Sequence, residues 1–251
     1  VRACDRHGAA VILGCFYQRQ DQRLADADAV RAGVASAVRW IGAQGFGNVL
    51  LEIANEAGHG GFDHALLKTA AGQVELIRLA KRIAADGPPG MPLLVSTSGL
   101  GGGALPEDVA AEADFLLVHF NGTPVGEIPA RIAALRRFGK PIVCNEDAKV
   151  GEEGARAAAA RVAGGASWGL MAEERNQRFP FAFLGAADDP AVYARLKELT
   201  APAAKAAQDP APYFPPPESK GGWRKLDRPD DIRRIGGMDP EKLAELRRWL
   251  L

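Results

Sequence analysis

The sequence has few cysteines, no excess of either charge and no long apolar run. Three cysteines among 251 residues are too few and too scattered for a disulfide framework or a cysteine-type zinc site. The 31 basic and 31 acidic residues give a formal net charge of zero, so the chain lacks the basic charge of a nucleic-acid-binding protein. A stretch of about 18 apolar residues, as a membrane-spanning helix needs, is also absent. We therefore expect neither nucleic acid nor a membrane as a partner.

In other respects the composition is that of an ordinary globular protein. Hydrophobic residues make up 47% and charged residues 25% of the chain, which are usual values. A chain of 251 residues is long enough for one (β/α) barrel, or for one medium-sized domain with extensions.

Short apolar runs alternate with amphipathic helical patterns from residue 9 to about residue 200. The runs lack the in/out alternation of half-exposed strands, as expected of parallel strands that helices cover. We expect strands at residues 9–15, 48–54, 92–98, 115–120, 141–145 and 166–171. We expect helices at residues 27–43, 66–85, 106–112, 124–138, 152–163 and 190–199, most of them ended by glycine.

This alternation is compatible with a doubly wound sheet or with a (β/α) barrel. A nucleotide-binding sheet would carry a glycine-rich phosphate motif, and the only candidate, residues 99–103, leads into a short helix begun by proline. We interpret that segment as a loop. Residues 1–8 have the pattern of a helix end closed by Gly8. We therefore predict an α/β fold, a TIM (β/α)8 barrel missing its first two strands, with strands 3–8 present in residues 1–200.

The end of the chain has a different composition. Residues 201–211 are rich in alanine and proline, and residues 212–217 should form an extended polyproline segment. A helix is expected at residues 240–251. We expect residues 201–251 to be a Pro-rich linker and terminal helix that lead to an additional C-terminal domain. A C-terminal extension packed on the barrel is the alternative.

Two of the expected strands end in the dipeptide Asn-Glu. Asn55 and Glu56 follow the second strand, and Asn145 and Glu146 end the fifth. Side chains at the carboxyl ends of barrel strands face the active site, so the two carboxylates should meet there. Two carboxylates are the minimal apparatus for cleaving a glycosidic bond. Glu52 shares the inward face with Glu56 one layer deeper, where a buried charge would need a partner.

Other polar and aromatic residues lie at the same ends of the expected strands. His119 lies near the end of the fourth strand, Asn121 follows that strand, and Trp168 lies in the sixth. Amides bind sugar hydroxyls, and an indole face packs against sugar C–H groups. A hydrogen-bonded structural role for His119 and a place in the barrel core for Trp168 are the alternatives. The spacing of His59 and His64 fits no established zinc pattern, and we expect no metal and no cofactor.

These segments resemble clan A glycoside hydrolases, the cellulase-like (β/α) barrels. Residues 51–56, Leu-Glu-Ile-Ala-Asn-Glu, are similar to the family's strand-4 signature, and residues 142–146, Ile-Val-Cys-Asn-Glu, to its strand-7 nucleophile segment. Residues 117–121 are similar to its strand-6 segment, and residues 7–13 to its junction of helix 2 and strand 3. The resemblance covers about residues 1–200. The family's strand-2 arginine has no counterpart here.

The resemblance implies a retaining glycosidase that hydrolyses a β-linked glycan by a two-glutamate double displacement. Glu56 would be the general acid/base and Glu146 the nucleophile. The carbohydrate substrate would be bound by residues at the neighbouring strand ends: Asn55, His119, Asn121 and Trp168. A secreted or periplasmic location is also implied. The alternative is a non-catalytic carbohydrate-binding or scaffold barrel fused to another module.

Overall fold

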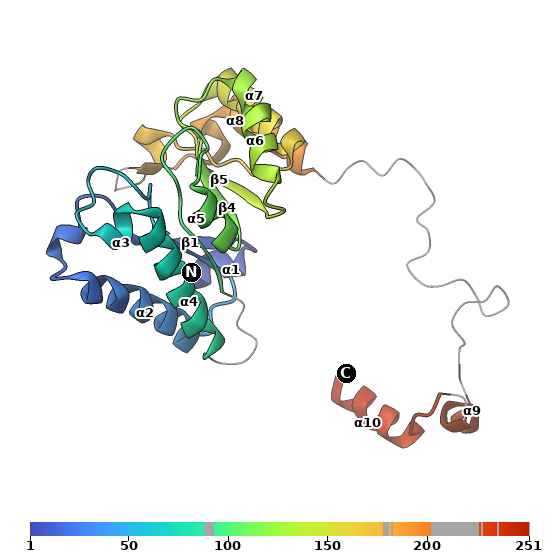
Figure 1. Cartoon of the computed structure of the whole chain (residues 1–251). Coiled ribbons are helices and arrows are strands. Elements are labelled where there is room, and N and C mark those ends of the chain that lie inside the picture. Colours follow the sequence, from blue (N-terminus) through green and yellow to red (C-terminus); the bar gives the residue numbers. More distant parts are fainter. Residues whose placement is uncertain are drawn as a thin grey trace. The chain divides into compact units, whose positions relative to one another are not determined.

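The computed structural model describes residues 1–87, 93–177, 181, 183–201, 226, 228–234 and 236–250. The chain divides into two compact units, Val1–Thr200 and Ala201–Leu251 (Figure 1). Within the described residues, the first unit holds all the strands, and the second holds helices α9 (Pro229–Arg234) and α10 (Pro240–Leu250). The expected polyproline segment, residues 212–217, lies outside the described residues.

Parallel strands in chain order form the centre of the first unit. They are β1 (Val11–Phe16), β2 (Val49–Ala54), β3 (Leu94–Ser96), β4 (Leu116–His119) and β5 (Ile142–Glu146). β1, β2 and β3 form one ladder, and β4 and β5 form another. A parallel bridge between Ser98 and Leu117 joins the two ladders. The order of the strands therefore follows the chain without the reversal of a doubly wound sheet, as in a (β/α) barrel.

The sixth expected strand, residues 166–171, differs from the prediction. It makes isolated parallel bridges, from Ala166 to Ile142 and from Leu170 to Asp147, instead of a regular ladder. Gly169 lies so close to the preceding strand that a Cβ there would stand 2.7 Å from the backbone oxygen of Asn145. The segment thus occupies the sixth position of the strand order as an irregular neighbour of β5.

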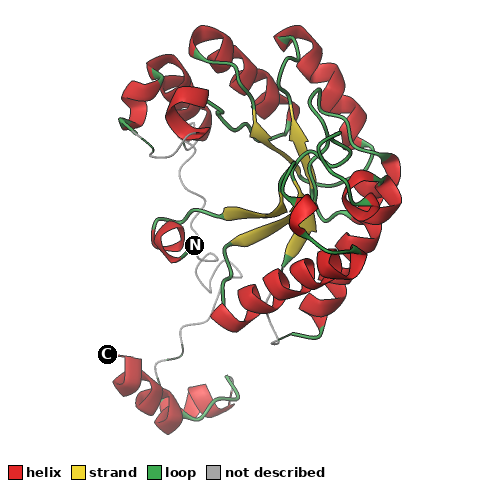
Figure 2. Ribbon diagram, turned by 90° about the vertical axis from the view of Figure 1, so that its left-hand side faces the viewer, coloured by secondary structure: helices red, strands yellow, loops and turns green. Residues whose placement is uncertain are grey.

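Helices lie on the outer side of the curved row of strands (Figure 2). α2 (Ala27–Gln44) follows β1, and α4 (Ala70–Ala85) follows β2 and packs against α2. α7 (Gly151–Gly164) follows β5 and packs against the last helix of the unit, α8 (Pro190–Thr200). The other helices and turns of the unit are α1 (Arg2–Arg6), η1 (Asp21–Arg23), α3 (Ala65–Lys68), α5 (Glu107–Glu112), η2 (Val125–Glu127), α6 (Ile128–Arg136), η3 (Glu173–Gln177) and η4 (Gly185–Asp188).

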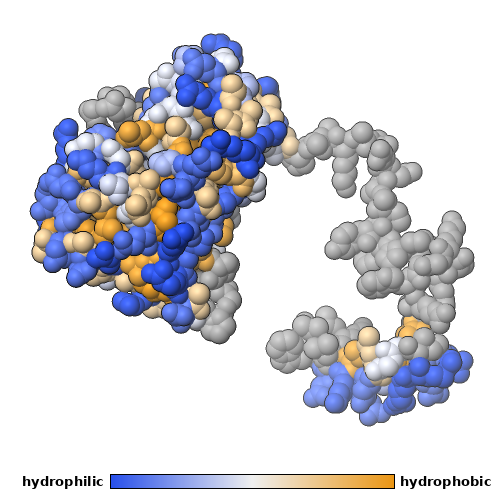
Figure 3. Space-filling model, viewed as in Figure 1, coloured by the Kyte–Doolittle hydropathy of each residue, from blue (hydrophilic) through white to orange (hydrophobic). Residues whose placement is uncertain are grey.

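Apolar side chains between strands and helices form the core. One cluster lies between β1–β3 and helices α2 and α4 and includes the buried residues Val34, Ile53 and Leu76. A second cluster lies between β4, β5 and α6 and includes Val118 and Ile132. On the face shown in Figure 3, apolar patches over α2 and α4 lie among hydrophilic side chains. None of the described helices is both long enough and apolar enough to cross a membrane.

The helix expected at residues 66–85 is broken in two at Thr69. Thr69 has an extended backbone (φ −107°, ψ 150°), and its hydroxyl accepts the N–H of Gly72 at 3.1 Å, so it caps α4. Gly72 lies so close to α3 that a Cβ there would stand 2.4 Å from the Cα of Leu66. The spacing of apolar residues in the sequence continues across the break, because Leu66 and the apolar face of α4 pack into the same cluster.

The other expected elements agree with the structure apart from small shifts at their ends. Of the strand expected at residues 92–98, Leu94–Ser96 form β3, and residue 92 lies outside the described residues. The helix expected at residues 124–138 begins as the 3₁₀ turn η2 and is α-helical from Ile128.

Substitution of Gly72 tests the close contact between α3 and α4. Because a Cβ would overlap backbone atoms of Leu66, we expect Gly72→Ala to lower the free energy of unfolding by about 1–3 kcal/mol. Urea unfolding measures this as a lower midpoint at constant m value. The matched control is Gly126→Ala, where a Cβ would meet no atom within 4 Å. Equal midpoints for the two variants would contradict the contact.

Candidate functional site

The carboxyl ends of the strands line a cleft of about 340 Å³. Most of its polar side chains come from β2, from β5 and from the residues just after β1 and β2, which parallel pairing brings to one edge, and Gln177 comes from η3. They are Tyr17, Gln20, Glu52, Asn55, Asn145, Glu146 and Gln177. The cleft therefore presents carboxylates and amides beside the aromatic rings of Phe16 and Tyr17.

The structure brings Glu56 and Glu146 together around His119, at the end of β4. The Nδ1 atom of His119 lies 3.4 Å from Glu56 Oε1 and 3.5 Å from Glu146 Oε2. One ligand atom from each of the three side chains lies within 4.8 Å of the other two. The His119 side chain is fully buried, whereas each glutamate side chain is 22% exposed. The arrangement is a close pair of solvent-accessible carboxylates supported by a buried imidazole.

Asn121 holds the carboxylate of Glu146. Its Nδ2 donates to Glu146 Oε1 at 2.5 Å, and its Oδ1 accepts the backbone N–H of Ala148 at 2.9 Å. The second bond fixes which end of the amide faces the glutamate. Asn121, predicted as a substrate ligand, thus lies in the site with its amide engaged by Glu146.

Glu56 lies just beyond β2 in a left-handed backbone conformation, with a φ of 53°. This conformation costs a residue with a side chain about 1–2 kcal/mol, so other contacts have to hold it. The carboxylate accepts a hydrogen bond from Gln18 Nε2 at 2.9 Å. The backbone N–H of Glu56 donates to Ser98 Oγ at 2.8 Å. Hydrogen bonds therefore hold both the carboxylate and the backbone of Glu56.

Glu52 is a third carboxylate at the floor of the cleft. Its side chain is buried, and its Oε1 accepts a hydrogen bond from the hydroxyl of Ser98 at 2.6 Å. Ser98 is therefore the polar partner that a buried carboxylate at this position was expected to need. Burial raises the pKa of Glu52, while the Ser98 hydrogen bond and the nearby His119 act in the opposite direction. Burial, and then the charge of Glu52, raise the pKa of the Cys15 thiol to about 12.

Asn55 also lies in the predicted place, and Tyr17 and Gln18 add contacts that the sequence prediction did not assign. Asn55 lines the cleft and is 9% exposed. Tyr17 lines the cleft with its side chain largely exposed, and burial followed by the charges of Glu146 and Glu56 raises its pKa. Tyr17 and Gln18 are the first two residues after the apolar strand β1, and this position is the sequence signal that could have placed them at the site.

The structure does not bring Trp168 into this cleft. Its Nε1 donates to Asp147 Oδ2 at 2.9 Å, and Asp147 is fully buried. Asp147 also pairs with Lys149 Nζ at 3.0 Å and with Arg161 Nη1 at 2.6 Å. Arg161, from α7, is fully buried and lies over the ring of Phe120 at 4.4 Å. Trp168, which is half-buried, thus donates a hydrogen bond to the buried ionic cluster of Asp147, Lys149 and Arg161 and is not among the residues that line the cleft.

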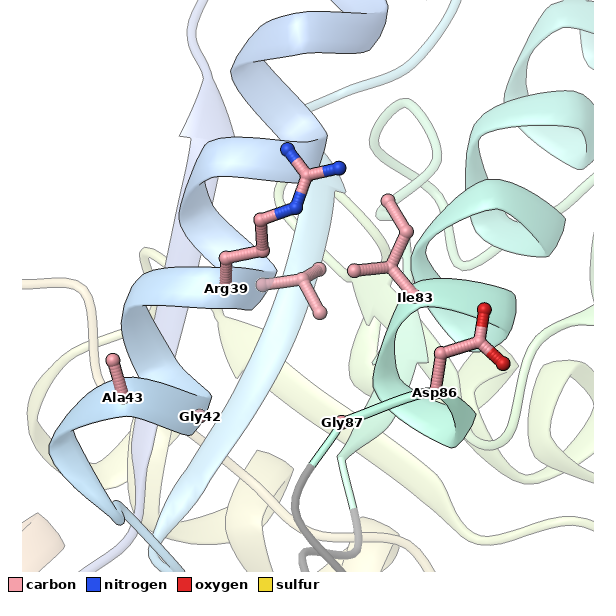
Figure 4. Close-up of a pocket in the computed structure, with 7 residues that line it drawn as sticks. Arg39, Gly42, Ala43, Ile83, Asp86 and Gly87 are labelled. Carbon is pink, nitrogen blue, oxygen red and sulfur yellow. The ribbon is translucent and has the colours of Figure 1, made fainter.

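A larger hollow lies at the other end of the strands. It measures about 370 Å³ and is lined by the C-terminal parts of α2 and α4, with Arg39 and Asp86 at its sides (Figure 4). The helices run antiparallel to the strands, so this groove lies at the amino ends of the strands, away from Glu56 and Glu146. The convergence of polar side chains identifies the carboxylate cleft as the candidate functional site.

The residues Glu56, His119 and Glu146 supply oxygen and nitrogen atoms that could together hold a divalent cation such as zinc. The two carboxylates alone could supply an acid and a nucleophile.

Comparison with known proteins supports the fold at the level of structure. No family model and no curated protein sequence matches the chain. The endoglucanase Cel5A from the hyperthermophilic Thermotoga maritima is similar with a TM-score of 0.52 at 10% identity, over 78% of this chain and 74% of that chain. The cellulose synthase subunit Z (CcsZ) from Clostridioides difficile gives a TM-score of 0.49 at 10% identity, over 78% and 76%. The chain therefore has a cellulase-like α/β fold with parallel strands, the coarser part of the predicted architecture.

Substitution of Arg161 tests the cluster behind β5. Arg161→Leu leaves the buried Asp147 with one cationic partner fewer, so we expect a loss of about 3 kcal/mol in the free energy of unfolding. Arg195→Leu, which breaks an exposed pair with Glu198, is the control and should cost less than about 1 kcal/mol. Urea unfolding distinguishes them, and similar losses would argue against a stabilising role for the buried pair.

The reactivity of Cys15 tests the electrostatics of the cleft floor. Because its pKa is about 12 and the thiolate is the reactive form, we expect alkylation by iodoacetamide to speed up roughly tenfold per pH unit from pH 8 to 10. Glu52→Gln removes a nearby negative charge and should accelerate the reaction at each pH. Mass spectrometry of the peptide that contains Cys15 follows the rate, with a free-cysteine peptide as control. A rate that is flat between pH 8 and 10 would disprove the raised pKa.

Proposed function

We propose that this chain carries the active site of a retaining glycoside hydrolase that acts on a β-linked glycan. The observation that carries the proposal is the convergence of Glu56 and Glu146 at the carboxyl ends of parallel strands, with carboxylate oxygens within 4.8 Å. Retaining glycosidases place their two carboxyl groups about 5–5.5 Å apart, whereas inverting enzymes need about 6.5–9.5 Å to admit a water molecule. The observed spacing supports double displacement.

In the first step, Glu146 attacks the anomeric carbon of the bound sugar. The bond from that carbon to the glycosidic oxygen breaks, its electron pair stays on the oxygen, and Glu56 gives the oxygen a proton. The product is a glycosyl ester of Glu146 and a free alcohol. The amide of Asn121 holds one oxygen of Glu146, which leaves the other, on the His119 side, to reach the sugar.

In the second step, water attacks the same carbon from the face that the leaving group vacated. Glu56, now a carboxylate, takes a proton from the water, and the ester bond to Glu146 breaks. Both glutamates return to their starting protonation states. Gln18 binds Oε2 of Glu56, so Oε1, which lies 3.4 Å from His119 Nδ1, would be the oxygen that transfers the proton in both steps.

The side chains of the cleft support a carbohydrate as the substrate. Its amides and carboxylates suit sugar hydroxyls, and Tyr17 offers an aromatic ring on which a sugar can pack. Asn55, beside Glu56, would bind the hydroxyl next to the anomeric carbon, and His119 would orient both carboxylates. Tyr17 lines the cleft and Trp168 does not, so Tyr17 is the better candidate for stacking on the substrate.

We further propose that the six successive strand positions of the first unit correspond to strands three to eight of a (β/α)8 barrel. The strand order and the preceding helix α1 support this correspondence.

A non-catalytic carbohydrate-binding barrel predicts different geometry at the same residues. Its carboxylates would be much more than 6 Å apart or buried in ion pairs. The close spacing and partial exposure of Glu56 and Glu146 favour hydrolysis instead.

The nucleophile is tested with Glu146→Ala on a panel of aryl β-glucosides, cellobiosides, mannosides and xylosides. Because no glycosyl ester can form, we expect the hydrolysis rate to fall by more than about a thousandfold. Azide should restore turnover by entering from the empty face, giving a glycosyl azide of inverted configuration. With Glu56→Ala, azide should attack the glycosyl ester and give the retained configuration.

The control for both substitutions is Glu153→Ala, which removes an exposed carboxylate of α7 and should leave the rate unchanged. Hydrolysis that persists at the wild-type rate in Glu146→Ala would sink the proposed mechanism. Wild-type protein that binds the panel without cleaving any member would favour the carbohydrate-binding alternative.

A further inference from the structure

We propose that Ser98 and Glu52 are positioning residues for Glu56. In this interpretation, a hydrogen-bond relay from the buried carboxylate of Glu52 through the hydroxyl of Ser98 holds the backbone of Glu56 in its left-handed conformation. The inference rests on the proposed function, in which Glu56 is the general acid/base.

The backbone of Glu56 has an unusual conformation. Among the described residues, Glu56 and Arg19 are the two non-glycine residues with a left-handed φ, 53° and 61°. Such a conformation persists where the surroundings impose it, and it is most often found at functional sites. Glu56 reaches Gln18 and His119 from this conformation, so the backbone decides where the carboxylate lies.

Contacts with Ser98 impose this conformation on Glu56. Three atoms of Ser98 bind the segment around Glu56. The hydroxyl oxygen accepts the N–H of Glu56 at 2.8 Å, the backbone oxygen accepts the N–H of Ala57 at 2.8 Å, and the backbone N–H donates to Ala54 at 3.3 Å. The first of these bonds is the one that a substitution of the side chain removes.

The Ser98 hydroxyl points to Glu52. The hydroxyl oxygen of Ser98 accepts the N–H of Glu56, and the hydroxyl donates its own proton to Glu52 Oε1 at 2.6 Å, so one hydroxyl links the two glutamates. Glu52 is buried, whereas the side chains of Glu56 and Glu146 are partly exposed to solvent. Glu52 is therefore a support beneath the acid/base.

Ser98→Ala tests the relay through the dependence of the rate on the leaving group. A misplaced general acid slows departure of a poor leaving group much more than departure of one that needs no proton. We expect kcat/KM to fall about tenfold or more for a phenyl β-glycoside. The 2,4-dinitrophenyl glycoside of the same sugar should lose less than about threefold. A purely structural loss of active protein lowers both rates by the same factor.

The matched control is Ser96→Ala. Ser96 is as fully buried as Ser98, and its hydroxyl donates to the backbone oxygen of Phe115 at 2.6 Å, away from Glu56. Any effect on this variant should be equal for both glycosides. Glu52→Gln keeps the side-chain volume but weakens the acceptor, so it should show the leaving-group dependence of Ser98→Ala at smaller size.

A crystal structure of Ser98→Ala provides a readout that does not need activity. We expect the φ of Glu56 to leave the left-handed region. If φ stays near 53° and the two glycosides are affected equally, the relay is overturned while the hydrolase proposal stands. If wild-type protein hydrolyses no glycoside, the hydrolase proposal fails, and the φ of Glu56 alone decides the relay. Should Ser98→Ala not fold, Glu52→Gln decides it: an equal loss for both glycosides would overturn the relay.

Discussion

One parallel bridge, between Ser98 and Leu117, connects the two ladders of strands, and the geometry of the site depends on it. Glu56 follows the first ladder, whereas His119 and Glu146 end strands of the second. Parallel pairing places all carboxyl ends at one edge, and this bridge decides which ends become neighbours. The contact between His119 and Glu56 crosses the junction. A sheet in which the ladders separated would leave each glutamate without the other.

The parts of the site that the sequence predicts are those set by strand ends. A continuous apolar run marks a buried strand, and the residue after it lies at the edge, which located Asn55, Glu56, His119, Asn121 and Glu146. The contacts of Ser98 depend on register, in which Glu52 lies opposite Ser96, and a shift of one residue would turn Ser98 to the other face. The orientation of Trp168 depends on Asp147 and on the irregular segment around Gly169. Neither the register nor this irregularity leaves a periodic signal in the sequence.

The cleft concentrates negative charge that the rest of the chain compensates. Two unit charges 4.8 Å apart repel by roughly 3.5 kcal/mol at an effective dielectric constant of about 20. The amides of Gln18 and Asn121 each donate to one glutamate, and the His119 ring lies between them. Behind β5, the cluster of Asp147, Lys149 and Arg161 carries one positive charge in excess, next in sequence to Glu146. Each glutamate thus has its own amide donor, and the excess positive charge behind β5 lies next to Glu146.

The two glutamates are held in place by different means, and the difference matches the tasks proposed for them. Glu146 is the last residue of β5, just past an irregularity in the pairing with β4, and the Asn121 amide binds its carboxylate, as suits a proposed nucleophile that attacks one carbon atom. Glu56 stands beyond its strand in a left-handed conformation that neighbouring groups impose. An acid/base exchanges a proton with the leaving oxygen in one step and with a water molecule in the next. The orientation of its carboxyl group therefore matters more than one exact position. Backbone support from Ser98 supplies that orientation while one carboxylate oxygen of Glu56 remains free of Gln18.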